Sequence, residues 1–414
     1  MQRSIRAYFN GVSHADVPST EVDSQKPFAC VRYAPTAKDW VEMTEGYTQQ
    51  HPAKGEIPSL SGVRAIAVLV VFVGHGLSAP SFWAGHVGVT VFFFLSGYLI
   101  VTLLRREYDR TNTISLSKFY MRRALRILPP AYLAIASAIV LGATGLLAAS
   151  TNIWGVLAEV FNYTNYYIVV SGREGLPPST TQLWSLGVEE HYYLIIPAVV
   201  LVLLRRRLTM RTVGFVLFGV ALLVPIWRIY LGLSGASFDR LYVSTDTRID
   251  SLLFGSAFAL ILNPAMGDKL PIRFQVSRSI SRWLAPVALV IFIASTQIPG
   301  QHFRLSVADV LQCFCLVPIF WFIITKPESR VGKFLNHPVI AHIGVLSFSI
   351  YLFHRMVIEV FAQVIDTGIA VDALALIVTI GIAQIVNWGV EAPCTRLRRK
   401  LESHVSRPPT IPAR

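Results

Sequence analysis

The sequence predicts an all-α integral membrane protein with about ten transmembrane helices. Hydrophobic residues make up 53% of the 414 residues and charged residues only 15%, so the chain has more apolar surface than a soluble core uses. Apolar runs long enough to span a bilayer recur along the chain. Basic residues cluster in every second connection between these runs, which is typical of cytoplasmic loops.

The charge distribution gives the expected topology, with both termini in the cytoplasm. Of the 37 Lys and Arg residues, 30 lie in segments that this topology places inside, and three (Arg173, Arg240 and Arg304) lie in outward loops. Positive-inside clustering also explains the net charge of +13, so we do not expect nucleic acid as a partner. The ten expected spans are residues 62–79, 86–104, 129–149, 183–204, 211–233, 246–262, 283–298, 305–325, 341–365 and 370–391.

Three regions are expected outside or beside these spans. Residues 1–56 are polar and lack the apolar region of a signal peptide, so we expect a poorly ordered cytoplasmic tail, with Met43 an alternative start. The membrane domain is expected at residues 57–395 and a basic cytoplasmic tail at 396–414. Between the second and third spans, apolar and cationic residues alternate, which predicts an amphipathic helix at the membrane surface. Pro129 and Pro130 are expected to turn the chain into the third span.

The first span carries an ionisable residue at each end. Arg64 and His75 are eleven residues apart, or roughly 16 Å along one helix. An ionisable side chain inside a span is costly, so His75 is a candidate functional residue. The alternative is a packing histidine that hydrogen-bonds to a neighbouring helix.

Other spans place ionisable groups in the same outer half of the membrane. The fourth span carries Glu189 and Glu190 near its outer end, and we expect Glu189 to be the partner of His75 with Glu190 in support. In the ninth span, Tyr351 and His354 are three residues apart and therefore share a helix face.

The sixth span begins with a third group of charges. Asp246, Arg248 and Asp250 lie in its first turns, and Arg228 in the fifth span is a candidate counter-ion. Arg248 and Asp250 could also form only an interfacial ion pair. Since several spans converge in this way, we expect a functional site that includes these groups.

The cytoplasmic side carries a dense cationic face. Arg122, Arg123 and Arg126 lie close together, with Arg64 at the foot of the first span. Such residues serve topology and attract anionic lipid, but together with a site across the bilayer they indicate a long, phosphate-bearing ligand. Ser96 and Gly97 lie at mid-depth in the second span, where small residues permit close helix packing or the passage of a slender ligand arm.

Six motifs in order resemble the acyltransferase-3 family of membrane-bound O-acyltransferases. They are R-x10-H (Arg64 and His75), GVTVFFFLSGYLI, R-x-x-R (Arg123 and Arg126), SLGVEEHYY, DTRIDSLLFG and SFSIYLFH. The resemblance covers residues 58–391 and is to members that lack a fused esterase-like domain. His191 departs from the pattern, since family members often have Gln at this place.

The resemblance implies transfer of an acyl group, commonly acetyl, from cytoplasmic acyl-CoA to a hydroxyl of a glycan, a glycolipid or a glycoside such as a macrolide. Arg64, Arg123 and Arg126 would then bind the CoA phosphates, with the pantetheine arm passing Gly97. His75, oriented by Glu189, would deprotonate the acceptor, and Arg248 or a backbone donor would stabilise the oxyanion. Direct transfer and an acyl-histidine intermediate both remain open.

Two other classes of protein also bury ionisable residues in a membrane. A proton-coupled transporter would do so, but we find neither an internal repeat nor paired broken helices in two halves. A non-catalytic scaffold would not need the cluster of ionisable groups. The four cysteines show no metal-ligand spacing, so no metal is expected. The expected location is the cytoplasmic membrane of a bacterium.

Overall fold

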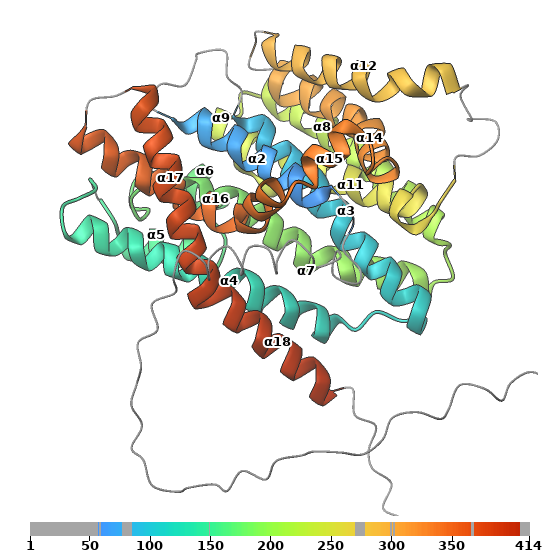
Figure 1. The fold of residues 1–414 in the computed structure, drawn as a ribbon, viewed down its shortest axis with the longest axis horizontal. Helices are drawn as coiled ribbons and strands as arrows, with labels where there is room; N and C mark the ends of the chain where they lie inside the picture. Colours follow the sequence, from blue (N-terminus) through green and yellow to red (C-terminus); the bar gives the residue numbers. More distant parts are fainter. Residues whose placement is uncertain are drawn as a thin grey trace, which may run out of the picture. The chain divides into compact units, whose positions relative to one another are not determined.

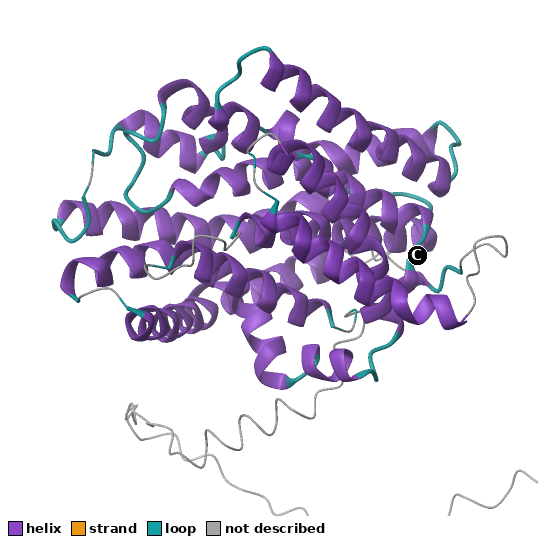
Figure 2. Ribbon diagram, turned by 90° about the horizontal axis from the view of Figure 1, so that it is seen from above, coloured by secondary structure: helices purple, strands orange, loops and turns teal. Residues whose placement is uncertain are grey.

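The computed structural model describes residues 57, 59–76, 85–148, 150–269, 278–298, 300, 303–365 and 368–405. Within these ranges the chain forms helices and no strand, which confirms the all-α prediction (Figures 1 and 2). The expected tail at residues 1–56, including Met43, lies entirely outside the described residues.

The helices follow one another with short connections. Their bounds are α2 Leu60–His75, α3 His86–Thr111, α4 Leu116–Ala143, α5 Ile153–Val160, α6 Thr164–Ser171, η1 Thr181–Leu183, α7 Trp184–Arg205, α8 Met210–Leu233, α9 Phe238–Val243, α10 Thr245–Arg248, α11 Asp250–Ile261, η2 Pro264–Met266, α12 Arg278–Gln297, η4 Arg304–Ala308, α14 Asp309–Thr325, α15 Arg330–Leu335, α16 Pro338–Val364, α17 Ile369–Val386, η5 Asn387–Glu391 and α18 Ala392–Val405. The segments η4 and η5 are π-helical turns.

The described chain is an integral membrane protein by the length and hydropathy of its helices. Seven helical segments are long and apolar enough to cross a membrane. Shorter apolar helices at Leu60–His75, Asp250–Met266 and Arg282–Gln297 occupy the places of the first, sixth and seventh expected spans. The count of ten spans and the cytoplasmic position of both termini remain predictions.

The expected break at the proline pair is wrong. Helix α4 is continuous from Leu116 to Ala143 and includes both Pro129 and Pro130. A proline removes only its own amide donor and disturbs the preceding turn, and two adjacent prolines disturb nearly the same turn. Helices in membrane proteins tolerate such a defect because neighbouring groups satisfy the freed carbonyls. The basic C-terminal segment is also helical as far as Val405, and α18 lies beside α4 (Figure 1).

Close backbone contact holds α3 against α11. A Cβ atom on Gly97 would lie 1.9 Å from the carbonyl oxygen of Leu252, and one on Gly255 would lie 2.0 Å from that of Phe94. Lipid tails are as apolar as the side chains, so tight van der Waals packing contributes much of the association of such helices. Gly97 therefore serves helix packing, the first of the two roles considered from the sequence.

Polar contacts join the C-terminal half of α3 to the segment after α11. Tyr98 donates a hydrogen bond to Asn263 Oδ1 at 2.6 Å, and Asn263 Nδ2 donates to Thr102 at 2.8 Å. Arg105 forms a two-pronged ion pair with Asp268, with distances of 2.7 and 2.9 Å. These bonds fix the register between α3 and α11.

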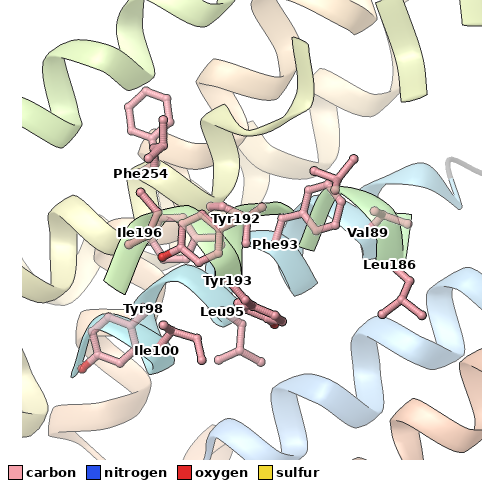
Figure 3. Packing of buried hydrophobic residues seen from close by; sticks show 14 of the residues in the cluster. Val89, Phe93, Leu95, Tyr98, Ile100, Leu186, Tyr192, Tyr193, Ile196 and Phe254 are labelled. Atoms are coloured by element: carbon pink, nitrogen blue, oxygen red, sulfur yellow. The ribbon is translucent and has the colours of Figure 1, made fainter. Parts of the chain in front are cut away.

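Aromatic rings fill the space between α3 and its neighbours. Phe93 and Tyr98 of α3 and Tyr193 of α7 belong to one cluster of buried hydrophobic residues (Figure 3). The rings of Phe94 and Phe320 meet edge to face with centroids 5.0 Å apart, and Tyr98 also lies edge to face with Phe320. The arrangement makes α3 the central helix of the region that carries the candidate site.

Candidate active site

One cavity brings together arginines from two helices. Its walls include Arg64 of α2 and Arg123 and Arg126 of α4, and its empty volume, open mouth included, is about 850 Å³. Among the described residues, none of these three guanidinium groups has a carboxylate within ion-pair distance. Arg123 also lies over the ring of Tyr193, 5.2 Å from its centroid. The cavity therefore has an electropositive part in which no guanidinium group is directly paired with a carboxylate among the described residues.

A carboxylate held by two hydroxyl groups forms another part of the same wall. Ser96 donates a hydrogen bond to Glu189 Oε1 at 3.0 Å, and Tyr193 donates to Oε2 at 3.0 Å. Ser96, Glu189 and Tyr193 all line the cavity. The neighbouring Glu190 leaves its buried Oε1 atom without a hydrogen-bond partner among the described residues.

Tyr351 of α16 lines the cavity as well and is anchored by α7. Its hydroxyl lies 2.6 Å from that of Ser185 and donates to the carbonyl oxygen of Gln182 at 2.9 Å. Gln182 Nε2 in turn donates to the carbonyl oxygen of Leu352 at 3.2 Å. These bonds tie the start of α7 to the middle of α16.

Two histidines meet next to Tyr351. His75 is the last residue of α2, and its side chain is exposed rather than buried within the helix. Its Nδ1 atom lies 3.0 Å from the carbonyl oxygen of Val71 and 3.3 Å from Nε2 of His354. The ring centroids of His354 and Tyr351 are 5.7 Å apart. The hydrogen-bond partners of His75 among the described residues are therefore Val71 and His354, not Glu189.

A loop before α7 is fastened to the same face of α16. Ser179, whose φ of +59° is unusual for a non-glycine residue, donates a hydrogen bond to Glu359. Arg355 donates to Thr181 and also pairs with Glu359 at 2.7 Å. The segment from Ser179 to Thr181 is thus held over the turn of α16 that follows His354.

The buried carboxyl group of Glu159 stabilises the loop that contains Thr180. Thr180 Oγ1 bonds to Glu159 of α5 and lies 2.6 Å from the carbonyl oxygen of Pro177. Glu159 is 2% exposed, and this burial, only partly offset by the Thr180 hydrogen bond, raises the pKa of its carboxyl group to about 8.

Arg228, Arg248 and Asp250 belong to a separate ionic cluster. Arg228 pairs with Asp250 and, at 2.8 Å, with Asp309, and Arg248 pairs with the same Asp309 oxygen. All four side chains are no more than 1% exposed. Two guanidinium groups and two carboxylates balance in charge, so the cluster joins α8, α10, α11 and α14 by a neutral network.

Further residues predicted for the site lie elsewhere. Asp246 pairs with Arg240 at 2.6 Å, and Arg122 pairs with Glu107 at 3.2 Å instead of facing the cavity. His191 contacts Thr245, with Nδ1 2.7 Å from its hydroxyl oxygen. The roles assigned to these residues and to the ionic cluster from the sequence remain predictions.

The sequence interpretation missed some residues that the structure brings to these places. Asp309 is the only acidic residue in the apolar run 305–325, and this isolation was a readable signal of a buried partner. Ser185 and Tyr193 lie within the motif SLGVEEHYY, but no contact was assigned to them. Glu359 gave no comparable signal, because its importance depends on which helices become neighbours.

Comparison with known proteins gives a family match across most of the chain. The model of the acyltransferase-3 family, described as an acyltransferase domain, matches residues 57–388. This range agrees with the extent of the resemblance seen in the motifs. No solved structure matches the chain.

Relatives occur in several bacteria. A Staphylococcus aureus (strain COL) protein with the provisional name O-acetyltransferase is 29% identical over 331 residues, which is 76% of this chain and 53% of that protein. The peptidoglycan O-acetyltransferase OatA of Listeria monocytogenes is 28% identical over 322 residues, with coverage of 75% and 50%. YrhL of Bacillus subtilis, provisionally named a peptidoglycan O-acetyltransferase, is 29% identical over 358 residues, with coverage of 81% and 54%. The chain spans about half the length of these curated relatives.

Proposed function

Because the chain belongs to the acyltransferase-3 family, we propose that it is a membrane O-acyltransferase that moves an acetyl group from cytoplasmic acetyl-CoA to a hydroxyl of a cell-envelope glycan. The observation that carries this proposal is the single cavity that joins Arg64, Arg123 and Arg126 to Tyr351, next to the His75–His354 pair. Arginines in the cavity wall and a candidate base close to Tyr351 suit a long anionic thioester.

The arginine end suits the phosphate groups of CoA. Guanidinium groups bind phosphate oxygens through charge-assisted and often bidentate hydrogen bonds. Since Arg64, Arg123 and Arg126 have no carboxylate partner among the described residues, their donors are available to a ligand. The pantetheine arm would then follow the wall formed by Ser96 and Phe93 towards Tyr351.

The transfer step is assigned to His75. Its imidazole would accept the proton of the acceptor hydroxyl as that oxygen attacks the thioester carbonyl carbon. A C–O bond forms and the C–S bond breaks, and the departing CoA sulfur receives the proton. Glu189, held by Ser96 and Tyr193, lines the route of the donor instead of contacting His75.

The names of the relatives support a glycan acceptor. OatA of Listeria is named for O-acetylation of peptidoglycan, and we extend this acceptor class to the present chain. The corresponding location is the bacterial cytoplasmic membrane, with the acceptor on its outer side. No metal takes part in this proposal.

The test uses the purified full-length chain in lipid nanodiscs with acetyl-CoA labelled in the acetyl group. We expect thioester consumption that is lost in His75→Ala and retained in His337→Ala, a control at an exposed histidine elsewhere. Mass spectrometry of cell-wall glycans with and without the gene identifies the acceptor. Proton-coupled solute uptake without thioester consumption would instead support the transporter alternative.

A further inference from the structure

The contact between His75 and His354 carries an inference that rests on the proposed function. We propose that His354 is a positioning residue that holds His75 in the tautomer with hydrogen on Nδ1. In this tautomer the lone pair of Nε2 is free to accept a proton. The two rings have centroids 5.0 Å apart, and His354 is only 1% exposed whereas His75 is exposed.

The hydrogen on His354 is located by a carbonyl oxygen. Nδ1 of His354 lies 2.7 Å from the carbonyl oxygen of Tyr351, which can only accept a hydrogen bond. Nδ1 must therefore carry hydrogen. Neither nitrogen of the buried ring contacts a carboxylate among the described residues, so a charged imidazolium would lack compensation. The neutral ring consequently presents a bare Nε2 atom, an acceptor, towards His75.

The hydrogen on His75 follows from its two neighbours. Nδ1 lies 3.0 Å from the carbonyl oxygen of Val71 and 3.3 Å from Nε2 of His354, and both of these atoms are acceptors. In the other tautomer of His75, the lone pair of Nδ1 would face the lone pairs of both acceptors, and no hydrogen bond would form with either. Nδ1 of His75 therefore carries the hydrogen and shares it between the two acceptors. Nε2 has no hydrogen-bond partner among the described residues.

The surroundings of His354 hold its ring in place. Tyr351, one turn earlier, is anchored to Ser185 and Gln182, and the next residue, Arg355, bonds to Thr181 and Glu359. The helices α2 and α16 also pack closely along their length. His354 can hold His75 in one tautomer only if its own ring is rigid, because a mobile His354 ring would let His75 exchange its hydrogen between Nδ1 and Nε2.

The test compares two substitutions of His354, each of which keeps the hydrogen-bonding role of only one ring nitrogen. His354→Gln extends an amide oxygen towards His75 and keeps an acceptor near the position of Nε2. His354→Asn keeps a donor for the carbonyl oxygen of Tyr351 but does not reach His75. We expect His354→Asn to lower kcat for acetyl transfer about 10-fold to 100-fold, which is the range seen for residues that orient a metal-ligating histidine. KM for acetyl-CoA should stay within about twofold of its value in the unmodified chain. His354→Gln should recover at least part of this loss.

The second readout is ¹⁵N NMR of protein labelled at histidine, with His75 assigned by its absence from the His75→Ala spectrum. We expect an unprotonated Nε2 and a protonated Nδ1 on His75 in the unmodified chain, and a mixture of tautomers in His354→Asn. Hydrogen on Nε2 of the unmodified chain would overturn the proposal. Equal loss of kcat in both amide variants with an unchanged His75 spectrum would overturn it too. The spectrum does not depend on turnover, so it tests the tautomer of His75 even if the protein transfers no acetyl group.

Discussion

Replacement of Asp309 by asparagine tests the interpretation of the buried ionic cluster. One oxygen of Asp309 accepts from both Arg228 and Arg248, and Thr90 lies 3.4 Å from the other oxygen. Asp309→Asn leaves two guanidinium groups against the single carboxylate of Asp250. All of these charged groups are no more than 1% exposed, so water does not compensate the excess positive charge.

The expected loss is large. Removal of one partner from a buried ion pair costs about 3–5 kcal/mol, or roughly two to three and a half orders of magnitude in the ratio of folded to unfolded protein. Arg248→Met added to Asp309→Asn leaves Arg228 and Asp250 as a balanced pair. The double variant should therefore be more stable than the single one. A solvent-exposed pair offers the control: Asp239→Asn removes the partner of Arg173, which is 51% exposed, and should cost no more than about 1 kcal/mol.

The assay is thermal denaturation of purified protein in one detergent, followed by the fraction that remains monodisperse on size-exclusion chromatography. We expect Asp309→Asn to lower the apparent Tm by about 5 °C or more, Asp239→Asn to lower it by no more than about 2 °C, and the double variant to lie closer to the unmodified chain. A Tm of Asp309→Asn equal to that of the control would refute the reasoning. A double variant less stable than Asp309→Asn would also refute it.

Three further predictions concern the donor site, the topology and a buried acid. Arg123→Ala should raise KM for acetyl-CoA about tenfold with a smaller change in kcat, since a remote phosphate contact contributes equally to ground and transition states. Arg123→Lys should reverse part of this rise in KM. An unchanged KM in correctly inserted protein would contradict the donor site. A cysteine at Ser171 should react with an impermeant maleimide in intact cells and one at Glu328 only after permeabilisation, and equal labelling would disprove the topology. Burial raises the pKa of Glu159 from 4.5 to about 8, so the contribution of this carboxyl group to stability should be fully present below pH 4.5 and be lost as the pH rises towards 8; Glu159→Gln should remove this part of the pH dependence of Tm.

The helical architecture was predictable because hydropathy along one dimension is sufficient to identify apolar helices. The order of apolar helices in the structure follows the order of the expected spans. Helix ends were less predictable. α2 stops at His75 because Gly76 turns to an extended conformation with ψ of 151°, and α4 continues through Pro129 and Pro130. Both outcomes depend on tertiary surroundings that hydropathy does not describe.

The partners of His75 were predicted only in part. His75 and Glu189 were paired because they were expected at the same depth, but depth is one coordinate of three. The lateral order of the helices decides the contact, and it places His354 of α16 beside His75. Glu189 faces Ser96 and Tyr193 instead. His354 had been expected in the functional site on the same helix face as Tyr351, and the structure gives it a specific contact with His75.

The arginines of the described chain fall into two groups, and the contrast bears on what the cavity binds. Arg105, Arg228 and Arg248 are each matched by a carboxylate in the same helical bundle. Arg64 and Arg123 are half-buried, as Arg105 is, yet no carboxylate lies within ion-pair distance of either among the described residues. Arginines needed only for topology could remain fully solvated, where an unpaired charge costs little. Partial burial without a directly paired carboxylate costs free energy, and a bound polyanion would offset that cost. The CoA donor proposed above carries several phosphates and would offset this cost more fully than a lipid headgroup bound at the open surface.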